Sequence, residues 1–186
     1  MSGYYMVCLD LEGRRCLVVG GGRVATEKAL GLLDAGAEVT VVAPEVDGEL
    51  AALPVELVHR RFTRSDVVDR FLVIAATNDR LVNADVSGAA RDRNVPCNVA
   101  DDPELCSFIL PAIVREGTIV AGVSTGGASP ALAQRLRTEI AELIRPEHAQ
   151  LAERLAALRP WAKQHFATYE ERRDFFKAFV AEVLEA

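Results

Sequence analysis

The sequence is poor in the residue patterns that hold metal ions. It has three histidines in 186 residues, and His59, His148 and His165 are too far apart to form a ligand-spaced pair. Its four cysteines form no C-x-x-C motif, and Cys16 falls inside an expected strand, where a structural thiol is the usual role. We therefore expect no metal site.

Long apolar runs and an excess of positive charge are also missing. No apolar run reaches the about 18 residues that a membrane span needs, and the N-terminus has no basic region followed by an apolar core. The formal net charge is −6, whereas nucleic-acid binding depends on Lys and Arg that neutralise phosphates. We expect a cytoplasmic protein without membrane or nucleic-acid partners, in which a local basic patch would still bind an acidic small molecule.

A glycine-rich turn is the most informative stretch that is present. Residues 16–19 form an apolar run that meets three glycines and then a helical pattern, in the form G-x-G-x-x-A. Gly20 permits the tight strand-to-helix turn, Gly22 lets the backbone approach a pyrophosphate, and Ala25 keeps the helix close to the sheet. The motif predicts a dinucleotide site with the pyrophosphate at the helix N-terminus.

The end of the next expected strand bears on the identity of the dinucleotide. An acidic residue about twenty residues past the glycines usually binds the adenosine ribose. Glu45 is the nearest candidate, and a backbone contact at Pro44 is an equal alternative. No arginine follows this strand closely, so the sequence favours NAD over NADP.

The first part of the chain alternates between apolar runs and helical patterns. Continuous apolar runs bounded by turn residues are typical of strands buried on both faces of a parallel sheet. Their alternation with helices predicts an α/β doubly wound (Rossmann) fold, with ligands outside the carboxyl ends of the strands. The expected strands are 4–9, 16–19, 38–42, 55–58, 71–75 and 95–99, and the expected helices are 24–33, which stops at Gly36, and 81–93.

The pattern changes near residue 107. Two apolar segments, 108–114 and 119–123, are joined by a turn and predict a β-hairpin. Ser129 as N-cap and Pro130 at the first helical position predict a helix over 131–144. Pro146 and Pro160 punctuate the remainder, where we expect helices over 148–158 and 169–184. The expected parts are an NAD-binding domain over 1–112, a small α+β dimerisation and substrate unit over 113–145, and a helical C-terminal region over 146–186.

Polar residues follow two further strands of the expected sheet. After the small residues at 75–76, Thr77 and Asn78 can hydrogen-bond a cofactor. Asn98, Asp101 and Asp102 follow the next strand and have two interpretations. They are either turn and capping residues, or they include a carboxylate beside the nicotinamide that acts as a base.

A second glycine-containing loop precedes the expected helix at 131–144. Glycines and hydroxyls before a helix N-terminus form a cradle for anions, and arginines lie further along this helix. The alternative is an ordinary loop capped by its serine. The candidate substrate-binding residues are Ser124, Thr125, Gly126, Gly127, Ser129 and Arg135, with Arg137 as a second arginine.

Five motifs occur in order along the chain. They are G-G-G-x-V-A at 20–25 with Lys28, A-A-T-N-D at 75–79, N-V-A-D at 98–101, S-F-I-L-P at 107–111 and S-T-G-G-A-S-P at 124–130. Together they resemble the precorrin-2 dehydrogenase family, which includes the N-terminal part of siroheme synthase and relatives that carry a ferrochelatase activity. Residues 146–186 resemble this family only as a helical extension.

The resemblance implies NAD-dependent oxidation of precorrin-2 to sirohydrochlorin, in siroheme synthesis, by a homodimer built through the second unit. It places the catalytic aspartate at Asp101 and not at its neighbour. It places NAD contacts at Arg23 and Val24 in the glycine turn, and at Pro44 and Glu45 after the second strand.

Two properties vary among the relatives that the motifs resemble. Some relatives also insert ferrous iron with the same aspartate, and the scattered His and Cys of this chain do not decide that point. Some carry a phosphorylatable serine where this chain has Thr125. The substrate itself fits the sequence, because precorrin-2 is a polycarboxylate and the loop at 124–129 with its arginines suits such an anion.

Two rival interpretations have different consequences. A non-catalytic dinucleotide-sensing Rossmann module would explain residues 1–100 equally well, but it gives the loop at 124–130 no purpose. A short-chain type dehydrogenase would need a Tyr-x-x-x-Lys pair, and Tyr4, Tyr5 and Tyr169 have no lysine at that spacing.

Overall fold

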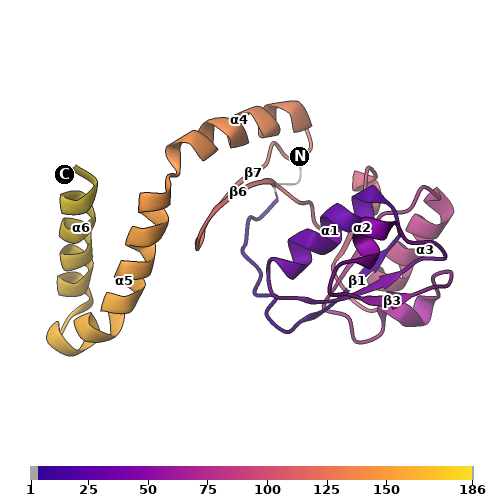
Figure 1. Cartoon of the computed structure of the whole chain (residues 1–186), viewed down its shortest axis with the longest axis horizontal. Helices are drawn as coiled ribbons and strands as arrows, with labels where there is room; N and C mark the ends of the chain where they lie inside the picture. Colours follow the sequence, from indigo (N-terminus) through magenta and orange to yellow (C-terminus); the bar gives the residue numbers. More distant parts are fainter. Residues whose placement is uncertain (1–3, 186) are drawn as a thin grey trace. The chain divides into compact units, whose positions relative to one another are not determined.

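The computed structural model describes residues 4–185 and divides the chain into two compact units, Met1–Leu110 and Pro111–Ala186. The first unit is built on a five-stranded parallel sheet in the order β3-β2-β1-β4-β5 (Figure 1). The order reverses beside β1, as in doubly wound dinucleotide-binding folds, and the expected fold class is confirmed. The strands are β1 (Arg15–Val19), β2 (Glu38–Val42), β3 (Glu56–Val58), β4 (Leu72–Ala75) and β5 (Cys97–Val99).

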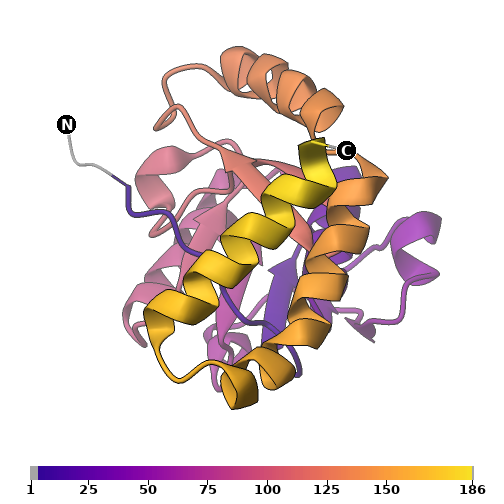
Figure 2. The same cartoon turned by 90° about the vertical axis from the view of Figure 1, so that its left-hand side faces the viewer.

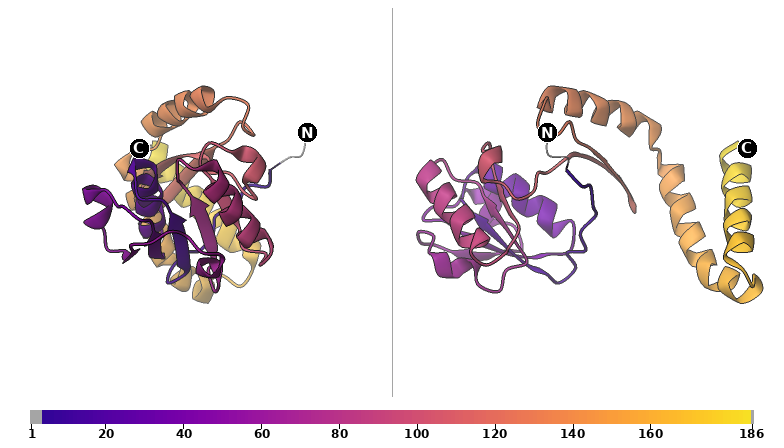
Figure 3. Two further views of the ribbon diagram at one scale, coloured as in Figure 1. Left: turned by 90° about the vertical axis from the view of Figure 1, so that its right-hand side faces the viewer. Right: turned by 180° about the vertical axis from the view of Figure 1, so that it is seen from behind.

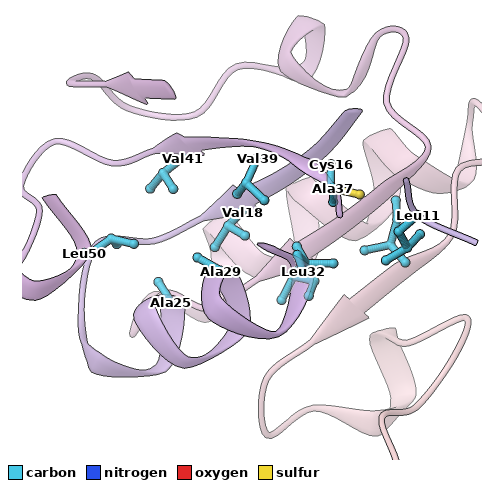
Figure 4. Packing of buried hydrophobic residues seen from close by; sticks show 12 residues of the cluster. Leu11, Cys16, Val18, Ala25, Ala29, Leu32, Ala37, Val39, Val41 and Leu50 are labelled. Carbon is cyan, nitrogen blue, oxygen red and sulfur yellow. The ribbon is translucent and has the colours of Figure 1, made fainter. Parts of the chain in front are cut away.

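Side-chain alternation along the strands divides the core of this unit into two layers. Cys16 and Val18 of β1 belong to the cluster that packs on α1 (Arg23–Leu33), as Figure 4 shows. Leu17 and Val19 belong to the opposite cluster, which packs on α3 (Arg80–Arg91). Because both faces of the sheet are covered, its strands appear in the sequence as continuous apolar runs, and the five strands expected between residues 16 and 99 are present.

One expected strand of the first unit is absent. Residues 4–10 form no strand, and their apolar side chains are exposed, Tyr5 to 90%. The prediction of a strand over 4–9 is wrong because an apolar run needs a neighbouring strand to complete its hydrogen bonds. Three short elements were not predicted: α2 (Gly48–Ala51) and the 3₁₀ turns η1 (Arg64–Val67) and η2 (Pro103–Leu105). A single turn is too short to show a period in the sequence.

The second unit begins with a two-stranded antiparallel sheet, β6 (Ala112–Glu116) and β7 (Ile119–Val123), as the sequence predicts. Gly117 opens the two-residue turn with φ +55°, a conformation that glycine adopts without strain. The helix α4 (Pro130–Leu143) packs on both strands. It begins as expected, with Ser129 as its N-cap and Pro130 in its first turn.

The unit ends in two antiparallel helices, α5 (Pro146–His165) and α6 (Tyr169–Glu185), which lie side by side in Figures 2 and 3. The expected helix end before Pro160 is wrong, because Pro160 lies inside α5. Beyond the proline, Ala162 is fully buried and the Trp161 ring lies 5.6 Å from the Phe175 ring of α6. This packing continues the helix through a residue that costs about 3 kcal/mol in a helix interior. No helix within residues 4–185 has the length and apolar character needed to cross a bilayer.

Candidate active site

The carboxyl ends of four strands form one continuous edge in the first unit. Val42, Val19, Ala75 and Val99 are register partners across β2, β1, β4 and β5. The residue after β1 donates its N–H to Val42 O at 3.0 Å, and the residue after β4 donates to Val19 O at 2.8 Å. The chain segments that follow these strands, which contain all the cofactor and catalytic residues predicted in this unit, therefore begin side by side.

The three glycines of the turn have different structural reasons. Gly20 has φ +132°, and a Cβ there would collide with the carbonyl of Ala76. A Cβ on Gly21 would collide with the carbonyl of Glu45. At Gly22 the only atom of residues 4–185 within 4 Å of an added Cβ is Oδ2 of Asp47, at 3.8 Å. Protein packing thus explains the first two glycines, whereas it leaves room for a side chain at the third.

The N-terminus of α1 is open. Gly22 occupies the N-cap and supplies no side-chain hydrogen bond, and the first turn contains no acidic residue. Within the described residues, no acceptor is bound to the backbone N–H groups of Arg23, Val24 and Ala25. Free N–H groups and the positive end of the helix dipole suit a pyrophosphate, so this turn fits the cofactor that the sequence predicts.

The loop after β2 packs against the glycine turn. Asp47 donates its backbone N–H to the carbonyl of Gly21 at 2.8 Å. Pro44 and Glu45, the predicted adenosine contacts, lie in this loop and are exposed. Asp47 is a candidate that the sequence analysis missed. It occupies the N-cap of α2, but its carboxylate does not cap that helix and lies next to Gly22.

Thr77, predicted to bind the cofactor through its hydroxyl, is held by a neighbour. Its Oγ1 lies 2.8 Å from Oδ1 of Asn83, and Asn83 donates its Nδ2 to the carbonyl of Thr77 at 3.0 Å. Asn83 is 6% exposed on the buried face of α3, where it and Ser87 are polar residues among apolar ones, a signal that the sequence interpretation passed over. Asn78 is exposed, and no hydrogen bond involves its side chain within residues 4–185.

The two aspartates after β5 have different surroundings. Asp101 is exposed in the left-handed region with φ +60°, and its carboxylate makes no hydrogen bond or ion pair with any described residue. Asp102 accepts a hydrogen bond from Nε of Arg80 at 3.0 Å, and its side chain is 17% exposed. Asn98, the third candidate, is buried and donates to the carbonyl of Phe108 at 3.0 Å. Asp102 and Asn98 thus have structural partners, whereas the carboxylate of Asp101 is available.

The buried cysteines are poor nucleophiles and poor metal ligands. Burial raises the pKa of the Cys16 thiol to about 11 and that of Cys97 to about 12. Burial also raises the pKa of Cys106. At neutral pH these groups remain protonated thiols. No cluster of three His, Cys, Asp or Glu side chains suited to a metal ion occurs within the described part of the chain.

The loop before α4 is held by hydrogen bonds among its own residues and the first turn of the helix. Ser129 Oγ accepts the N–H of Leu132 at 3.2 Å, which caps the helix. The hydroxyl of Thr125 donates to the carbonyl of Ser129 at 3.1 Å and accepts its N–H at 3.0 Å. Because Pro130 has no N–H, this helix start leaves only the N–H of Ala131 for a ligand. Between these residues, Gly126 and Gly127 have φ +64° and +86°.

The two arginines of α4 are already engaged. Arg135 donates Nε to Glu139 at 2.7 Å, one helical turn along the exposed face. Arg137 donates Nε to the carbonyl of Ile113 in β6 at 2.9 Å. An incoming carboxylate would therefore compete with a carboxylate at Arg135 and with a backbone carbonyl at Arg137.

Comparison with known proteins decides the family. Residues 7–112 match the family described as putative NAD(P)-binding. The chain belongs to this family. Residues 122–143 also match the central part of the sirohaem biosynthesis protein. The expectation of a nicotinamide dinucleotide cofactor and the resemblance to the precorrin-2 dehydrogenase family are confirmed.

Two siroheme synthases and one solved structure are similar to this chain. The chain is 42% identical over 94% of its length to the siroheme synthase of Nitrosomonas eutropha, and 44% identical over 92% to that of Methylobacillus flagellatus. It spans 38% of the length of each. Among solved structures it is similar to SirC, a precorrin-2 dehydrogenase, with 28% identity, a TM-score of 0.77, and coverage of 95% of this chain and 89% of that one.

Proposed function

We propose that this protein oxidises precorrin-2 to sirohydrochlorin with NAD as the hydride acceptor. The observation that carries the proposal is the row of loops at the sheet edge, where the open start of α1 and the unpartnered Asp101 carboxylate both follow register-paired strands. The similarity to siroheme synthases and to SirC supports this substrate.

The first unit would hold the dinucleotide along this edge. The N–H groups of Arg23 and Val24 would bind the pyrophosphate beside Gly20 and Gly22. Pro44, Glu45 or Asp47 would contact the adenosine half, and a carboxylate there favours NAD over NADP. Thr77 and Asn78 would border the nicotinamide half, with Thr77 acting through the loop shape that Asn83 maintains.

The reaction removes two hydrogens from the substrate, one as a hydride and one as a proton. NAD, when bound, supplies the carbon that accepts the hydride. Asp101 would accept the proton, since its carboxylate has no partner among the described residues to compete for it. Asp102 is tied to Arg80 and would support the turn.

The second unit would contribute to substrate binding. The peripheral carboxylates of the tetrapyrrole would contact Ser124, Thr125, Gly126, Gly127 and Ser129, with Arg135 turning from Glu139 to the ligand. Because the start of α4 is largely closed, the exposed loop itself would provide most of these contacts.

We also propose that the protein is a homodimer formed through the second unit. An isolated two-stranded sheet is marginal in water, and α4 leaves Leu132, Leu136 and Leu143 exposed at 50%, 37% and 72%. Their spacing places them on one side of the helix, and Val120 of β7 is also exposed, at 42%. A partner copy would cover this stripe. Light scattering should give twice the mass of the chain, and a monomer mass at working concentration would contradict the proposal.

Incubation with precorrin-2 and NAD tests the activity. NADH absorbance and the sirohydrochlorin spectrum should rise together and in equal amounts. NAD binding without turnover would favour the rival function, a non-catalytic sensing module. Addition of ferrous iron to the sirohydrochlorin formed would test chelation in the same cuvette. We propose the cytoplasm as the location, because a reducing compartment suits the four free thiols.

A further inference from the structure

Asp101 has a backbone conformation that is uncommon for a residue other than glycine. Val99 accepts the backbone N–H of Asp102 at 3.4 Å, which closes a β-turn over Ala100 and Asp101. Asp101 occupies its third position with φ +60°, a site that glycine or asparagine normally fills. A strained residue of this kind costs about 1–3 kcal/mol and persists only where its surroundings fix it. The closing hydrogen bond is long, so other contacts must hold the turn.

The thiol of Cys106 makes several of those contacts, beside the ion pair between Arg80 and Asp102 and the hydrogen bond from the N–H of Leu105 to the carbonyl of Asp102 at 3.1 Å. Its Sγ accepts the backbone N–H of Val99 at 3.1 Å. Its S–H can donate to the carbonyl of Val99 at 3.3 Å or to that of Asp102 at 3.4 Å. One side chain therefore reaches both ends of the turn. The amide of Asn98 adds a longer contact to the same sulfur, at 3.6 Å.

We infer that Cys106 is a positioning residue that holds the carboxylate of Asp101 in its reactive orientation. The inference rests on the proposed function, because it gives Asp101 the task of accepting the substrate proton. The thiol stays protonated, since burial raises its pKa, and it can therefore donate and accept at once. A group displaced by about 1 Å from its reactive geometry can lose a hundredfold in rate, so weak contacts at this turn matter for turnover.

Cys106→Ala removes the contacts and should lower kcat by roughly tenfold while NAD affinity stays unchanged. Cys106→Ser keeps a donor and an acceptor at the same place and should restore most of the rate. In an Asp101→Asn background, Cys106→Ala should lower kcat by less than about twofold, because residues that act as a unit are not additive. An equal loss in both backgrounds would show that the thiol acts independently of Asp101 and would overturn the inference.

Ser87 offers a matched control. Its hydroxyl donates to the carbonyl of Leu105 at 2.6 Å, in the same loop, and within the described residues it makes no hydrogen bond to residues 99–102 or to Cys106. Ser87→Ala should lower the melting temperature without changing kcat, which would separate loss of stability from loss of positioning.

Amide hydrogen exchange at Asp102 tests, without any substrate, whether the thiol of Cys106 holds the turn. Exchange should be faster in Cys106→Ala than in the wild type, and unchanged in Ser87→Ala. Unchanged exchange in Cys106→Ala would overturn the inference even if the protein proved inactive on precorrin-2. By contrast, a strong loss of kcat in Asp101→Asn combined with wild-type kcat in Cys106→Ala would leave the proposed function standing and remove the role of the thiol.

Discussion

Two helices of this protein begin after glycine-containing loops, and their first turns are built differently. At α1, Gly22 occupies the N-cap without a side-chain hydrogen bond, and three backbone N–H groups are left open. At α4, Ser129 accepts one N–H and Pro130 has none to offer. A glycine-rich loop before a helix is therefore insufficient evidence for an anion site. The capping residue decides whether the helix terminus is available to a ligand.

A third start, at η1, has an acidic residue that folds back onto the N-cap residue Thr63. Asp66 accepts the N–H of Thr63 at 2.8 Å and pairs with Arg60 at 2.6 Å. The three starts separate ligand binding from stability. Substitutions at the open start of α1 should change affinity, whereas substitutions of the side chains that bond the starts of α4 and η1 should change the free energy of unfolding.

The largest expected effect on binding is at Gly22. Gly22→Asp places a carboxylate where the pyrophosphate would lie, and a close pair of like charges costs several kcal/mol. NAD affinity measured by calorimetry should fall by more than about a hundredfold in a protein that remains folded.

Two alanine variants control for the steric effect at the glycine turn. Gly22→Ala has room in the protein and should fold normally with weakened NAD binding. Gly20→Ala should mainly lose stability, because its Cβ would meet the Ala76 carbonyl and its φ is +132°. Unchanged NAD affinity in folded Gly22→Asp would remove the cofactor from this turn.

Asp101→Asn should affect turnover and leave NAD binding intact. Asparagine tolerates the left-handed backbone as well as aspartate does, so the turn is retained while the proton acceptor is lost. Turnover should fall by roughly a hundredfold or more, the usual contribution of a positioned acid–base group.

Asp102→Asn is the matched control, since it weakens the contact with Arg80 and should cost stability more than rate. Near wild-type turnover by Asp101→Asn would make Asp101 a turn former only. Such a result would leave the open start of α1 as the cofactor site.

Ser129→Ala opens the start of α4 and should cost about 1 kcal/mol of stability, as the loss of an N-cap normally does. Urea denaturation should show this loss with NAD affinity unchanged. A gain in NAD affinity would mean that the second loop, once uncapped, competes for the cofactor, and the distinction between the two starts would fail.

The smallest effect is expected at Asp66. Its hydrogen bonds from Arg60 and then from Thr63 hold its pKa below the usual value, so the folded pKa lies below the unfolded one. Its stabilising contribution is therefore complete above the unfolded pKa of about 3.9 and is lost as pH falls through the folded value. Asp66→Asn should be less stable than the wild type at pH 7, by up to about 1 kcal/mol, and the difference should shrink in acid. A difference that is constant with pH would contradict this.

Much of the fold could be predicted because buried parallel strands have an obvious sequence signature. The two wrong predictions concerned segments whose structure depends on packing partners far away in the sequence. The run at 4–9 is apolar but has no neighbouring strand, and Pro160 remains helical because α6 packs beside it. Both outcomes are tertiary effects that a local pattern does not contain.

The candidate site shows the same limit. The glycine turn and the strand ends could be located from spacing alone, and the structure aligns them at one edge. The bond between Thr77 and Asn83 could not be foreseen, because α3 must first fold back against β4. The nearness of Asp47 to Gly22 likewise depends on how two loops pack.

The central claim is that the open start of α1 binds the dinucleotide and the capped start of α4 does not. Titration of isotope-labelled protein with NAD, followed by amide chemical shifts, tests this claim most directly. We predict large shifts at the amides of Arg23, Val24 and Ala25, and none at Ala131 and Leu132. Shifts at the start of α4 with none at the start of α1 would contradict it.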